Sequence, residues 1–332
     1  MKALYNEFVR RIAMIYTFTF NPSIDYFMKV NEVSLMDAEV NRSSEDIFKV
    51  GGKGINVSKT LNELEIDSTA VILSGGFTGQ FICDEIDKMK HVKRKSFEVS
   101  GNNRINMKLQ MLEQTFCING QGPVIRDNIK SEILAYLTMI TSDDWILICG
   151  SLAKNMDIHF LIEIAKIIHD RKAKLIVDME LDIETLKKLK PYLIKPNFYE
   201  FESLIQKSLT NEQQFKESLQ FMIQNGVDNI LLSMDKNGAI FANKDHYYQL
   251  SQENIKAVHS VGPGDAMLAA FIGKLYSGES IEEALKWGGA AGSAVVSGYK
   301  DIDMSTIKDF LNQMKVKKIR GGEFTYESKI RF

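Results

Sequence analysis

The sequence predicts an α/β fold, a doubly wound and mostly parallel sheet flanked by helices. Beyond Gly122 and Pro123, apolar runs of strand length alternate with segments of helical periodicity. Helices between strands imply a parallel sheet that is covered on both faces. Two earlier segments, about 26–50 and 98–118, are extended and polar, so we expect a small inserted β-sheet there. No long linker or repeat divides the chain, which predicts a single α/β domain.

The composition is that of an ordinary globular protein, with 45% hydrophobic and 25% charged residues in a chain of 332. The net charge of −2 gives no reason to expect nucleic acid or an anionic membrane as a partner. The longest apolar runs are far shorter than the roughly 20 residues of a membrane span. Cys83, Cys117 and Cys149 form no CxxC pair, which argues against a zinc site and a disulfide framework. We therefore expect a cytoplasmic enzyme whose partners are small molecules, with no nucleic acid and no membrane.

Both ends of the chain are expected to lie outside the fold. Residues 1–13 precede the first strand-like run, so we treat them as an N-terminal extension that is either an upstream start or not native. The domain is expected to span 14–320, and 321–332 would form a C-terminal tail. The basic segment from Lys315 is expected to be a helix end, and the basic run 90–95 a solvated helix end or loop.

Two early loops place polar groups at the carboxyl ends of strands, where ligands gather in open α/β sheets. The run 14–20 is followed by Asn-Pro-Ser-Ile-Asp, which puts Asp25 at this edge unless it is a plain turn residue. The run Gly-Gly-Lys-Gly-Ile-Asn at 51–56 leads into a helix, and its glycines and lysine suggest a backbone that approaches an anion. Neither GxxxxGK[ST] nor GxGxxG after a strand occurs, which argues against a P-loop enzyme and against a dehydrogenase.

The extended segment 103–109 alternates between polar and apolar residues. Arg104, Asn106 and Lys108 fall on one face, and Ile105 and Met107 fall on the other. Two cations and an amide on one strand face can hold a phosphate, to which arginine can donate two hydrogen bonds. The alternative is an exposed polar face of a sheet.

The later strands also end in polar residues. The strand at 145–149 is followed by Gly150 and Ser151, and a helix over about 156–171 leads to the strand 174–177. After the next strand, the sequence Lys-Pro-Asn-Phe-Tyr-Glu at 195–200 can hold Mg²⁺ through water, or its glutamate is an ordinary residue of a first helical turn. Short strands at 229–234, 239–242 and 247–250, with turn signals between them, predict antiparallel hairpins.

The stretch Ser-Val-Gly-Pro-Gly-Asp at 260–265 precedes a helical run of small apolar residues. Gly262 and Gly264 allow a tight turn, so backbone N–H groups and the positive end of the helix dipole would face an anion. Asp265 could then accept a proton from an attacking hydroxyl while the helix end holds the charge of a phosphate in transit. Alternatively, Asp265 only complements the dipole of the helix.

Six motifs occur in the order found in the ribokinase-like, phosphofructokinase B family of sugar kinases, which the chain resembles over nearly all of residues 14–313. These motifs are Asn-Pro-Ser-Ile-Asp (21–25), Gly-Gly-Lys-Gly-Ile-Asn (51–56), Gly-Gly-Phe-Thr-Gly (75–79), Arg-Ile-Asn-Met-Lys (104–108), Lys-Pro-Asn-x-x-Glu (195–200) and Gly-x-Gly-Asp (262–265). Among family members the chain is most similar to bacterial kinases of fructose 1-phosphate, followed by kinases of tagatose 6-phosphate.

The resemblance implies an ATP- and Mg²⁺-dependent kinase of a phosphorylated ketohexose. The expected reaction converts fructose 1-phosphate to fructose 1,6-bisphosphate, and the alternative converts tagatose 6-phosphate to tagatose 1,6-bisphosphate. The small sheet, with segments of about 26–50 and 98–118, would act as a lid and as the interface of a homodimer. A non-catalytic sensor of sugar phosphates is the alternative from another functional class.

The resemblance also implies a role for each motif. Asp265 would be the general base, and Gly262 and Gly264 would belong to the anion hole. The sugar phosphate would be bound by Asp25, Gly51, Gly52, Lys53, Asn56, Arg104, Lys108 and Ser151. The nucleotide would lie near Lys195, Asn197, Ser233 and Gly238, and Asn197 and Glu200 would organise Mg²⁺ through water.

Several residues depart from the usual pattern of the family. Pro263 replaces an alanine and removes one backbone N–H from the expected anion hole. Asn103 stands where threonine is common, and Asp235 replaces a frequent glycine near the nucleotide. These departures affect expectations of substrate choice and rate more than expectations of the fold, and Pro263 motivates the sensor alternative.

Overall fold

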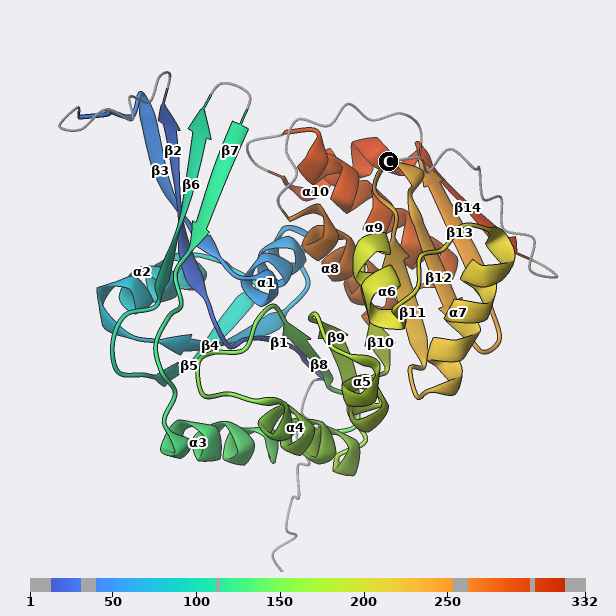
Figure 1. Ribbon diagram of the computed structural model, residues 1–332, viewed down its shortest axis with the longest axis horizontal. Coiled ribbons are helices and arrows are strands. Elements are labelled where there is room, and N and C mark those ends of the chain that lie inside the picture. Colours follow the sequence, from blue (N-terminus) through green and yellow to red (C-terminus); the bar gives the residue numbers. More distant parts are fainter. Residues whose placement is uncertain (1–12, 31–39, 112–113, 253–261, 299–301, 320–332) are drawn as a thin grey trace, which may run out of the picture.

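The computed structural model describes residues 13–30, 40–111, 114–252, 262–298 and 302–319. Its main element is a ten-stranded sheet. The strands of this sheet are β1 (Ile15–Thr19), β4 (Ser68–Ser74), β5 (Val92–Glu98), β8 (Trp145–Cys149), β9 (Lys174–Asp178), β10 (Leu193–Ile194), β11 (Asn229–Ser233), β12 (Ala239–Asn243), β13 (Tyr247–Gln252) and β14 (Met314–Ile319). In space they follow the order β14-β13-β12-β11-β10-β9-β8-β1-β4-β5 (Figure 1).

The main sheet is parallel over most of its width. Neighbouring strands from β5 to β11 run parallel, and those from β11 to β14 run antiparallel. The β11–β12 and β12–β13 hairpins are the ones that the turn signals at 235–238 and 243–245 predicted. The predicted α/β fold with a mostly parallel sheet is therefore confirmed.

The two edge strands differ from the sequence predictions. The segment expected to be a helix end from Lys315 forms β14, which pairs antiparallel with β13. The basic run expected to be a helix end or loop mostly lies in β5, the parallel neighbour of β4. Both strands expose lysines, such as Lys93 and Lys317. Charged side chains on an edge strand discourage pairing with a further chain, and the same charges hide the strand pattern in the sequence.

Helices cover both faces of the main sheet, as Figure 1 shows. One face carries α1 (Lys53–Glu63), α2 (Gly76–Asp87), α8 (Pro263–Tyr276), α9 (Ile281–Val296) and α10 (Met304–Leu311). The opposite face carries α3 (Asp127–Leu137), α4 (Ile158–Asp170), α5 (Ile183–Leu189), α6 (Phe198–Ile205) and α7 (Glu212–Gln224). A short 3-10 helix, Asp235–Asn237, lies between β11 and β12.

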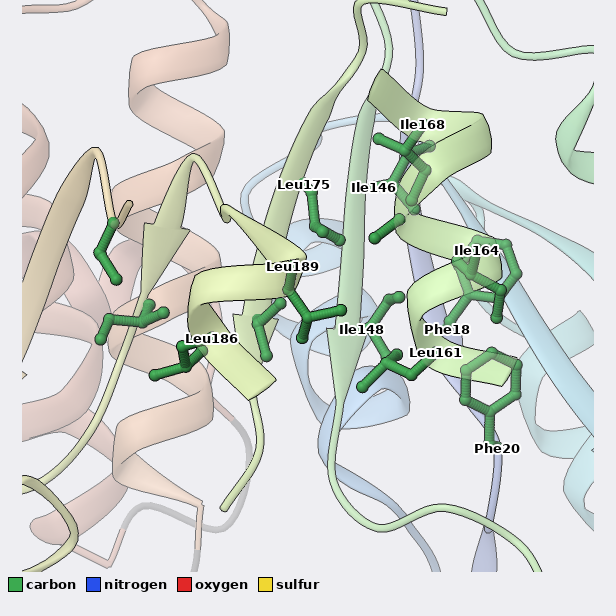
Figure 2. Close-up of a cluster of buried hydrophobic side chains, with 14 of the residues drawn as sticks. Phe18, Phe20, Ile146, Ile148, Leu161, Ile164, Ile168, Leu175, Leu186 and Leu189 are labelled. Atoms are coloured by element: carbon green, nitrogen blue, oxygen red, sulfur yellow. The ribbon is translucent and has the colours of Figure 1, made fainter. Parts of the chain in front are cut away.

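Strand periodicity divides the core between these two helix layers. In β8, Ile146 and Ile148 pack with the layer of α3 to α7, whereas Trp145 and Leu147 pack with the layer that contains α8 and α9. Figure 2 shows part of the first cluster, in which strand side chains meet those of α4 and α5. Close packing on both faces holds the carboxyl ends of the strands in fixed positions.

A separate four-stranded sheet projects from the main body beside α1 and α2 (Figure 1). Its order is β3-β2-β6-β7, with bounds of β2 (Ser23–Val30), β3 (Glu45–Gly51), β6 (Arg104–Met111) and β7 (Gln114–Asn119). Strands β2 and β6 are parallel, and the two outer pairs are antiparallel. The register aligns Ser23 with both Gly51 and Arg104, so three strands meet the main body at one junction.

The small sheet has two unlike faces. Its polar face carries Asp25, Lys49, Asn106 and Lys108, which the strand register places on the same side. Its apolar face carries, among others, Tyr26, Ile24, Phe48, Ile105, Met107, Phe116 and Ile118. The end of the apolar face nearest the body packs on α1 and α2 through Ile24.

Some predicted segments fall outside the described residues. These are the N-terminal extension 1–13, apart from residue 13, the C-terminal tail 321–332, the first two residues of the 260–265 stretch, and residues 31–39 and 112–113 of the two expected lid segments. Within the described ranges, no helix is long and apolar enough to cross a membrane.

Candidate active site

Asp265 lies in the first turn of α8, at the carboxyl edge of the main sheet. Gly262 caps this helix with a φ of 91°, a left-handed conformation that favours glycine. The Asp265 side chain is only 7% exposed, and the Nδ2 of Asn56 donates a hydrogen bond to its Oδ2 at 2.7 Å. The predicted loop 51–56 and the predicted helix start therefore meet, although 209 residues separate these two side chains.

The environment of Asp265 shifts its acidity. Burial, and then the negative charge of Asp178, raise the pKa of Asp265 to about 6. The hydrogen bond from Asn56 and the positive charges of Lys195 and Lys53 act in the opposite direction. At neutral pH the group is therefore mostly an ionised carboxylate, and it binds a proton more readily than an ordinary aspartate does.

Two lysines converge on Asp178, a residue at the end of β9. The Nζ of Lys53 lies 3.0 Å from Asp178 Oδ1, and the Nζ of Lys195 lies 3.5 Å from the same oxygen. Asp178 is 2% exposed and Lys195 is 5% exposed, so this pair is buried, whereas Lys53 is 35% exposed at the rim of the charge cluster. Together with Asp265, the cluster has two positive and two negative groups, which keeps its net charge near zero.

Neighbouring carboxylates stabilise the protonated form of Lys53. Burial alone lowers the pKa of Lys53, but the attraction and the hydrogen bond of Asp178 raise it above the ordinary lysine value. Asp265 and Glu200 add to this effect through their negative charges. Lys53 is thus a permanent cation beside the candidate base.

Asp178 was not predicted as a site residue. The available signal was its place at the carboxyl end of a buried apolar strand, the same signal that singled out Asp25. Among the described residues, none hydrogen bonds to the buried Oδ2 of Asp178. This buried oxygen therefore keeps its hydrogen-bonding capacity unused.

Gly264 provides room for one of these lysines. A Cβ atom at Gly264 would lie 3.1 Å from the Nζ of Lys195, so a side chain would press on the ammonium group. Gly54 has a similar role in α1, since its Cβ would lie 2.9 Å from the backbone oxygen of Phe18. Gly54 therefore allows α1 to approach the end of β1 closely, and Gly264 leaves room for the ammonium group of Lys195.

Asp25 lies at the junction with the small sheet, where three side chains hold it. Its Oδ1 accepts hydrogen bonds from Ser23 Oγ at 3.0 Å and Asn106 Nδ2 at 2.8 Å. Its Oδ2 lies 3.2 Å from the Nζ of Lys108. A Cβ at Gly51 would lie 2.6 Å from Asp25 Oδ1, which explains the glycine there.

The cations predicted to bind a phosphate are spread over the junction and the polar face. Arg104 donates from Nε to the backbone oxygen of Asn21 at 3.0 Å, and burial lowers its pKa. Lys108 lies 5.1 Å from the centre of the Phe27 ring, and Lys49 lies 5.6 Å from the same centre. Lys49 was missed by the sequence predictions, because only the register of β3 against β2 places it beside Asp25.

Ser151 follows β8 and also reaches the junction. The Nδ2 of Asn21 lies 3.3 Å from the Oγ of Ser151. The site therefore includes residues from the β1–β2 connection and from the end of β8. Gly52 completes this side with a φ of 125°, which again favours glycine.

The residues predicted to lie near the nucleotide follow β10 and β11. Asn197 and Glu200 form a capping box at the start of α6: Asn197 Oδ1 accepts from Glu200 N, and Glu200 Oε2 accepts from Asn197 N, both at 2.8 Å. Asn197 also pairs with Ser233 in an isolated parallel bridge. Gly238 has a φ of 84° in the following turn, where a Cβ would collide with the backbone of Leu250.

Comparison with known proteins settles the family. The model of the pfkB family carbohydrate kinases matches residues 19–308. The chain belongs to this family. As a kinase of this family it takes ATP as the phosphate donor and a small carbohydrate as the acceptor.

This kinase resembles several named relatives over almost its whole length. It is 32% identical over 306 residues to a D-tagatose-1-phosphate kinase of Bacillus licheniformis, and the alignment covers 91% of this chain and 99% of the relative. It is 30% identical over 307 residues to a 1-phosphofructokinase of Bacillus subtilis, and the alignment covers 92% of this chain and 100% of the relative. The structure of phosphofructokinase-2 from Escherichia coli in complex with substrates and products superposes with a TM-score of 0.83 at 23% identity, covering 90% of this chain and 99% of that one. The ribokinase-like fold expected from the motifs is confirmed.

Proposed function

We propose that this kinase transfers a phosphoryl group from ATP to the 6-hydroxyl of fructose 1-phosphate and forms fructose 1,6-bisphosphate. The observation that carries the proposal is the buried carboxylate of Asp265, with a pKa of about 6, at the N-terminus of α8 beside two lysines. The 30% identity to the 1-phosphofructokinase of Bacillus subtilis supports this acceptor.

In the proposed step, the 6-hydroxyl oxygen attacks the γ-phosphorus of ATP while Asp265 takes the hydroxyl proton. A bond forms between the sugar oxygen and the γ-phosphorus, and the bond between this phosphorus and the oxygen bridging to the β-phosphate breaks. ADP leaves with the bonding electrons. The N–H groups of Gly264 and Asp265 lie in the first turn of α8, where the helix dipole favours negative charge on the moving phosphoryl group.

The substrate's own phosphate is assigned to the junction and the polar face of the small sheet. Arg104, Lys49 and Lys108 bring three positive charges, and Asp25 balances one of them. The resulting charge of two suits a phosphate monoester, whose second pKa lies near 6. Asp25 and Asn56 would hold the sugar hydroxyls, with Gly51, Gly52, Lys53 and Ser151 lining the same region.

The nucleotide is assigned to the side of Lys195, Asn197, Ser233 and Gly238. Mg²⁺ would neutralise charge on the phosphates of ATP. The described residues include no group of three His, Cys, Asp or Glu side chains able to hold a metal directly. Because Asn197 and Glu200 oxygens already cap α6, they fit Mg²⁺ best through water.

A second acceptor has support from one comparison. The relative from Bacillus licheniformis is named for D-tagatose 1-phosphate, which differs from fructose 1-phosphate at carbon 4. A tagatose-6-phosphate kinase of Staphylococcus epidermidis is 29% identical over 284 residues, covering 84% of this chain and 91% of that relative, and keeps tagatose 6-phosphate among the candidates. The predicted sensor has less support, since the family is one of kinases and Asp265 is in place.

A panel of sugar phosphates tests the proposal. ADP release is measured with fructose 1-phosphate, tagatose 1-phosphate, tagatose 6-phosphate, fructose 6-phosphate and fructose. We expect the highest kcat/KM for fructose 1-phosphate. A higher kcat/KM for either tagatose phosphate would show that this sugar phosphate, and not fructose 1-phosphate, is the preferred acceptor. Binding without any turnover would favour the sensor.

We also propose that two copies of the chain pair through the apolar face of the small sheet. Ile118 is 61% exposed on this face, Phe48 is 49% exposed and Phe116 is 48% exposed. On the same face, Tyr26 stacks on Phe48 with ring centres 4.2 Å apart. A contiguous apolar patch of this kind is commonly covered in a soluble protein, and a second copy offers a surface of matching chemistry.

A further inference from the structure

Asn103 lies at the point where the chain passes from the main body into β6, and it is almost completely buried, with 2% exposure. Its side-chain amide uses both of its hydrogen-bonding ends. The Oδ1 accepts from the backbone N–H of Gly75 at 2.8 Å, and the Nδ2 donates to the backbone oxygen of Leu73 at 2.9 Å. One side chain thus ties the start of β6 to the end of β4 and to the loop before α2.

The backbone of Asn103 joins the same contact. Its N–H donates to the oxygen of Gly75 at 3.3 Å, and its own oxygen accepts from the hydroxyl of Thr78 at 3.1 Å. A Cβ at Gly79 would lie 2.8 Å from Asn103 Oδ1, so a side chain there would displace the amide. The Gly-Gly-Phe-Thr-Gly motif at 75–79 is therefore shaped to receive Asn103, which gives this motif a purpose at the site.

The next residue along the chain is Arg104, whose guanidinium lies at the junction of the two sheets. Its Nε donates to the oxygen of Asn21, and its pKa is influenced by burial and by the charge of Asp25. Consecutive Cα atoms are about 3.8 Å apart, so a fixed Asn103 fixes the root of the Arg104 side chain. Without the amide, the two backbone contacts, the pairing of β6 with β2 and the hydrogen bond from Arg104 to Asn21 would remain, but the side-chain link from β6 to the end of β4 would be lost.

We propose that Asn103 is a positioning residue for the sugar-phosphate site. It holds Arg104 in place relative to the carboxyl edge of the main sheet, where Asp265 lies. This inference rests on the proposed function, because Arg104 is assigned there to the phosphate of the substrate. The threonine common at this position in the family has one polar atom on a shorter side chain, so its hydroxyl cannot reach both partners as the two separate ends of the amide do. This kinase thus relies on an amide for a contact that does not itself touch substrate.

The test is a comparison of steady-state constants for Asn103→Ala and Asn103→Thr with those of the wild type. We expect Asn103→Ala to raise the KM for fructose 1-phosphate about 10-fold, with kcat within about threefold and the KM for ATP unchanged. The reason is that the substrate phosphate is bound equally in the ground state and the transition state, so its loss affects KM. Asn103→Thr should give an intermediate KM, since one hydrogen bond can be kept.

Asn229→Ala is the matched control. Asn229 is also buried, and it likewise makes two side-chain hydrogen bonds, to the oxygen of Tyr192 at 2.7 Å and to Asn243 Nδ2 at 3.2 Å. It begins β11, so it lies at the amino ends of the parallel strands, whereas the candidate site lies at their carboxyl ends. We expect this variant to lower Tm comparably and leave both KM values unchanged. If Asn103→Ala lowers Tm but also leaves the KM for the sugar phosphate unchanged, Asn103 is merely structural and the inference is overturned.

Hydrogen–deuterium exchange supplies a readout that does not depend on the substrate. Faster exchange of the 104–111 backbone in Asn103→Thr and Asn103→Ala, but not in Asn229→Ala, is expected if Asn103 holds β6. Equal exchange in this segment for all variants would overturn the inference. If the wild type phosphorylates no member of the sugar-phosphate panel, the proposed function fails by itself, and the exchange result still decides whether Asn103 positions the start of β6.

Discussion

The acidity of Asp265 results from opposing effects on one buried carboxyl group. Burial and the charge of Asp178 favour the protonated form, while Asn56 and two lysines favour the carboxylate. The outcome is a pKa of about 6 instead of the ordinary 3.8, which suits the role of general base that we propose for Asp265. The sequence placed Asp265 at a helix start, but its acidity depends on Asp178, which only the folded sheet brings near.

This raised pKa predicts a pH-dependent effect of Asp265→Asn on stability. The folded state binds the Asp265 proton more tightly than the unfolded state does, so wild-type stability from this group is complete below pH 3.8 and is lost as pH rises through about 6. Asp265→Asn, which cannot ionise, should therefore be more stable than the wild type at pH 7.5, by at most about 3 kcal/mol. Denaturant unfolding at pH 4 and pH 7.5 measures the difference, which should shrink at the lower pH.

Asp303→Asn is a control of opposite sign. Asp303 caps α10, and its hydrogen bond from the backbone N–H of Thr306 lowers its pKa. Its stabilising effect is therefore present above pH 3.8 and is lost as pH falls. We expect no gain in stability from Asp303→Asn at pH 7.5. Equal stability of Asp265→Asn and the wild type at both pH values would contradict the assigned acidity of Asp265.

At the scale of elements, the N-terminus of α8 combines a glycine cap with a proline in the first turn. The sequence raised the concern that Pro263 removes an N–H from the anion hole. Pro263 is in fact the first residue of α8, a position whose N–H has no partner within a helix and where the fixed φ of proline suits the helix. Helix formation therefore loses no hydrogen bond, and the remaining expected consequence of Pro263 is one fewer N–H donor for the phosphoryl group that we propose binds there.

Pro263→Ala separates these two effects. The substitution restores one N–H donor at the helix start, so we expect kcat to increase about three- to tenfold, because donors aimed at developing charge stabilise the transition state. The unfolded chain becomes more flexible, which should lower the free energy of unfolding by about 0.4–1 kcal/mol. Initial rates and denaturant unfolding measure both quantities.

Pro191→Ala, between α5 and β10, is the control for this substitution, and it should leave kcat unchanged. An unchanged or lower kcat in Pro263→Ala would show that the N–H at position 263 has no role in phosphoryl transfer.

At the scale of the whole molecule, the sequence predicted the sheet and its helix layers because the alternation of strands and helices can be recognised from the spacing of the apolar residues. The hairpins of β11 to β13 were predicted from their turn residues. The strands β5 and β14 were not, because charged side chains on edge strands mask a strand pattern. The same limit applied to the candidate site: Asp265, Asn56 and Asp25 lie in recognisable motifs, whereas Lys49 joins the candidate site only through strand register. The only sequence signal for Asp178 was its place at the carboxyl end of a buried strand.

The apolar face of the small sheet predicts the state of assembly. Ile118→Asp places a charge in the proposed interface, where it would be buried without a partner, so we expect the dimer to dissociate. Phe221→Asp, on the exposed side of α7, is the control and should leave the dimer intact; Phe221 is 45% exposed. Sedimentation velocity measures the mass of each variant. A monomeric wild type, or an Ile118→Asp variant that remains a dimer, would contradict the proposed interface.

The most direct measurement of the central claim is ³¹P NMR of a mixture of the protein, Mg²⁺, ATP and fructose 1-phosphate. We expect the γ-phosphate signal of ATP to fall while a second phosphate ester appears on carbon 6 of the same sugar. Asp265→Asn should slow this conversion by about 10²–10⁴-fold, the usual contribution of a general base. Release of inorganic phosphate without a new ester, or an Asp265→Asn variant as fast as the wild type, would contradict the account.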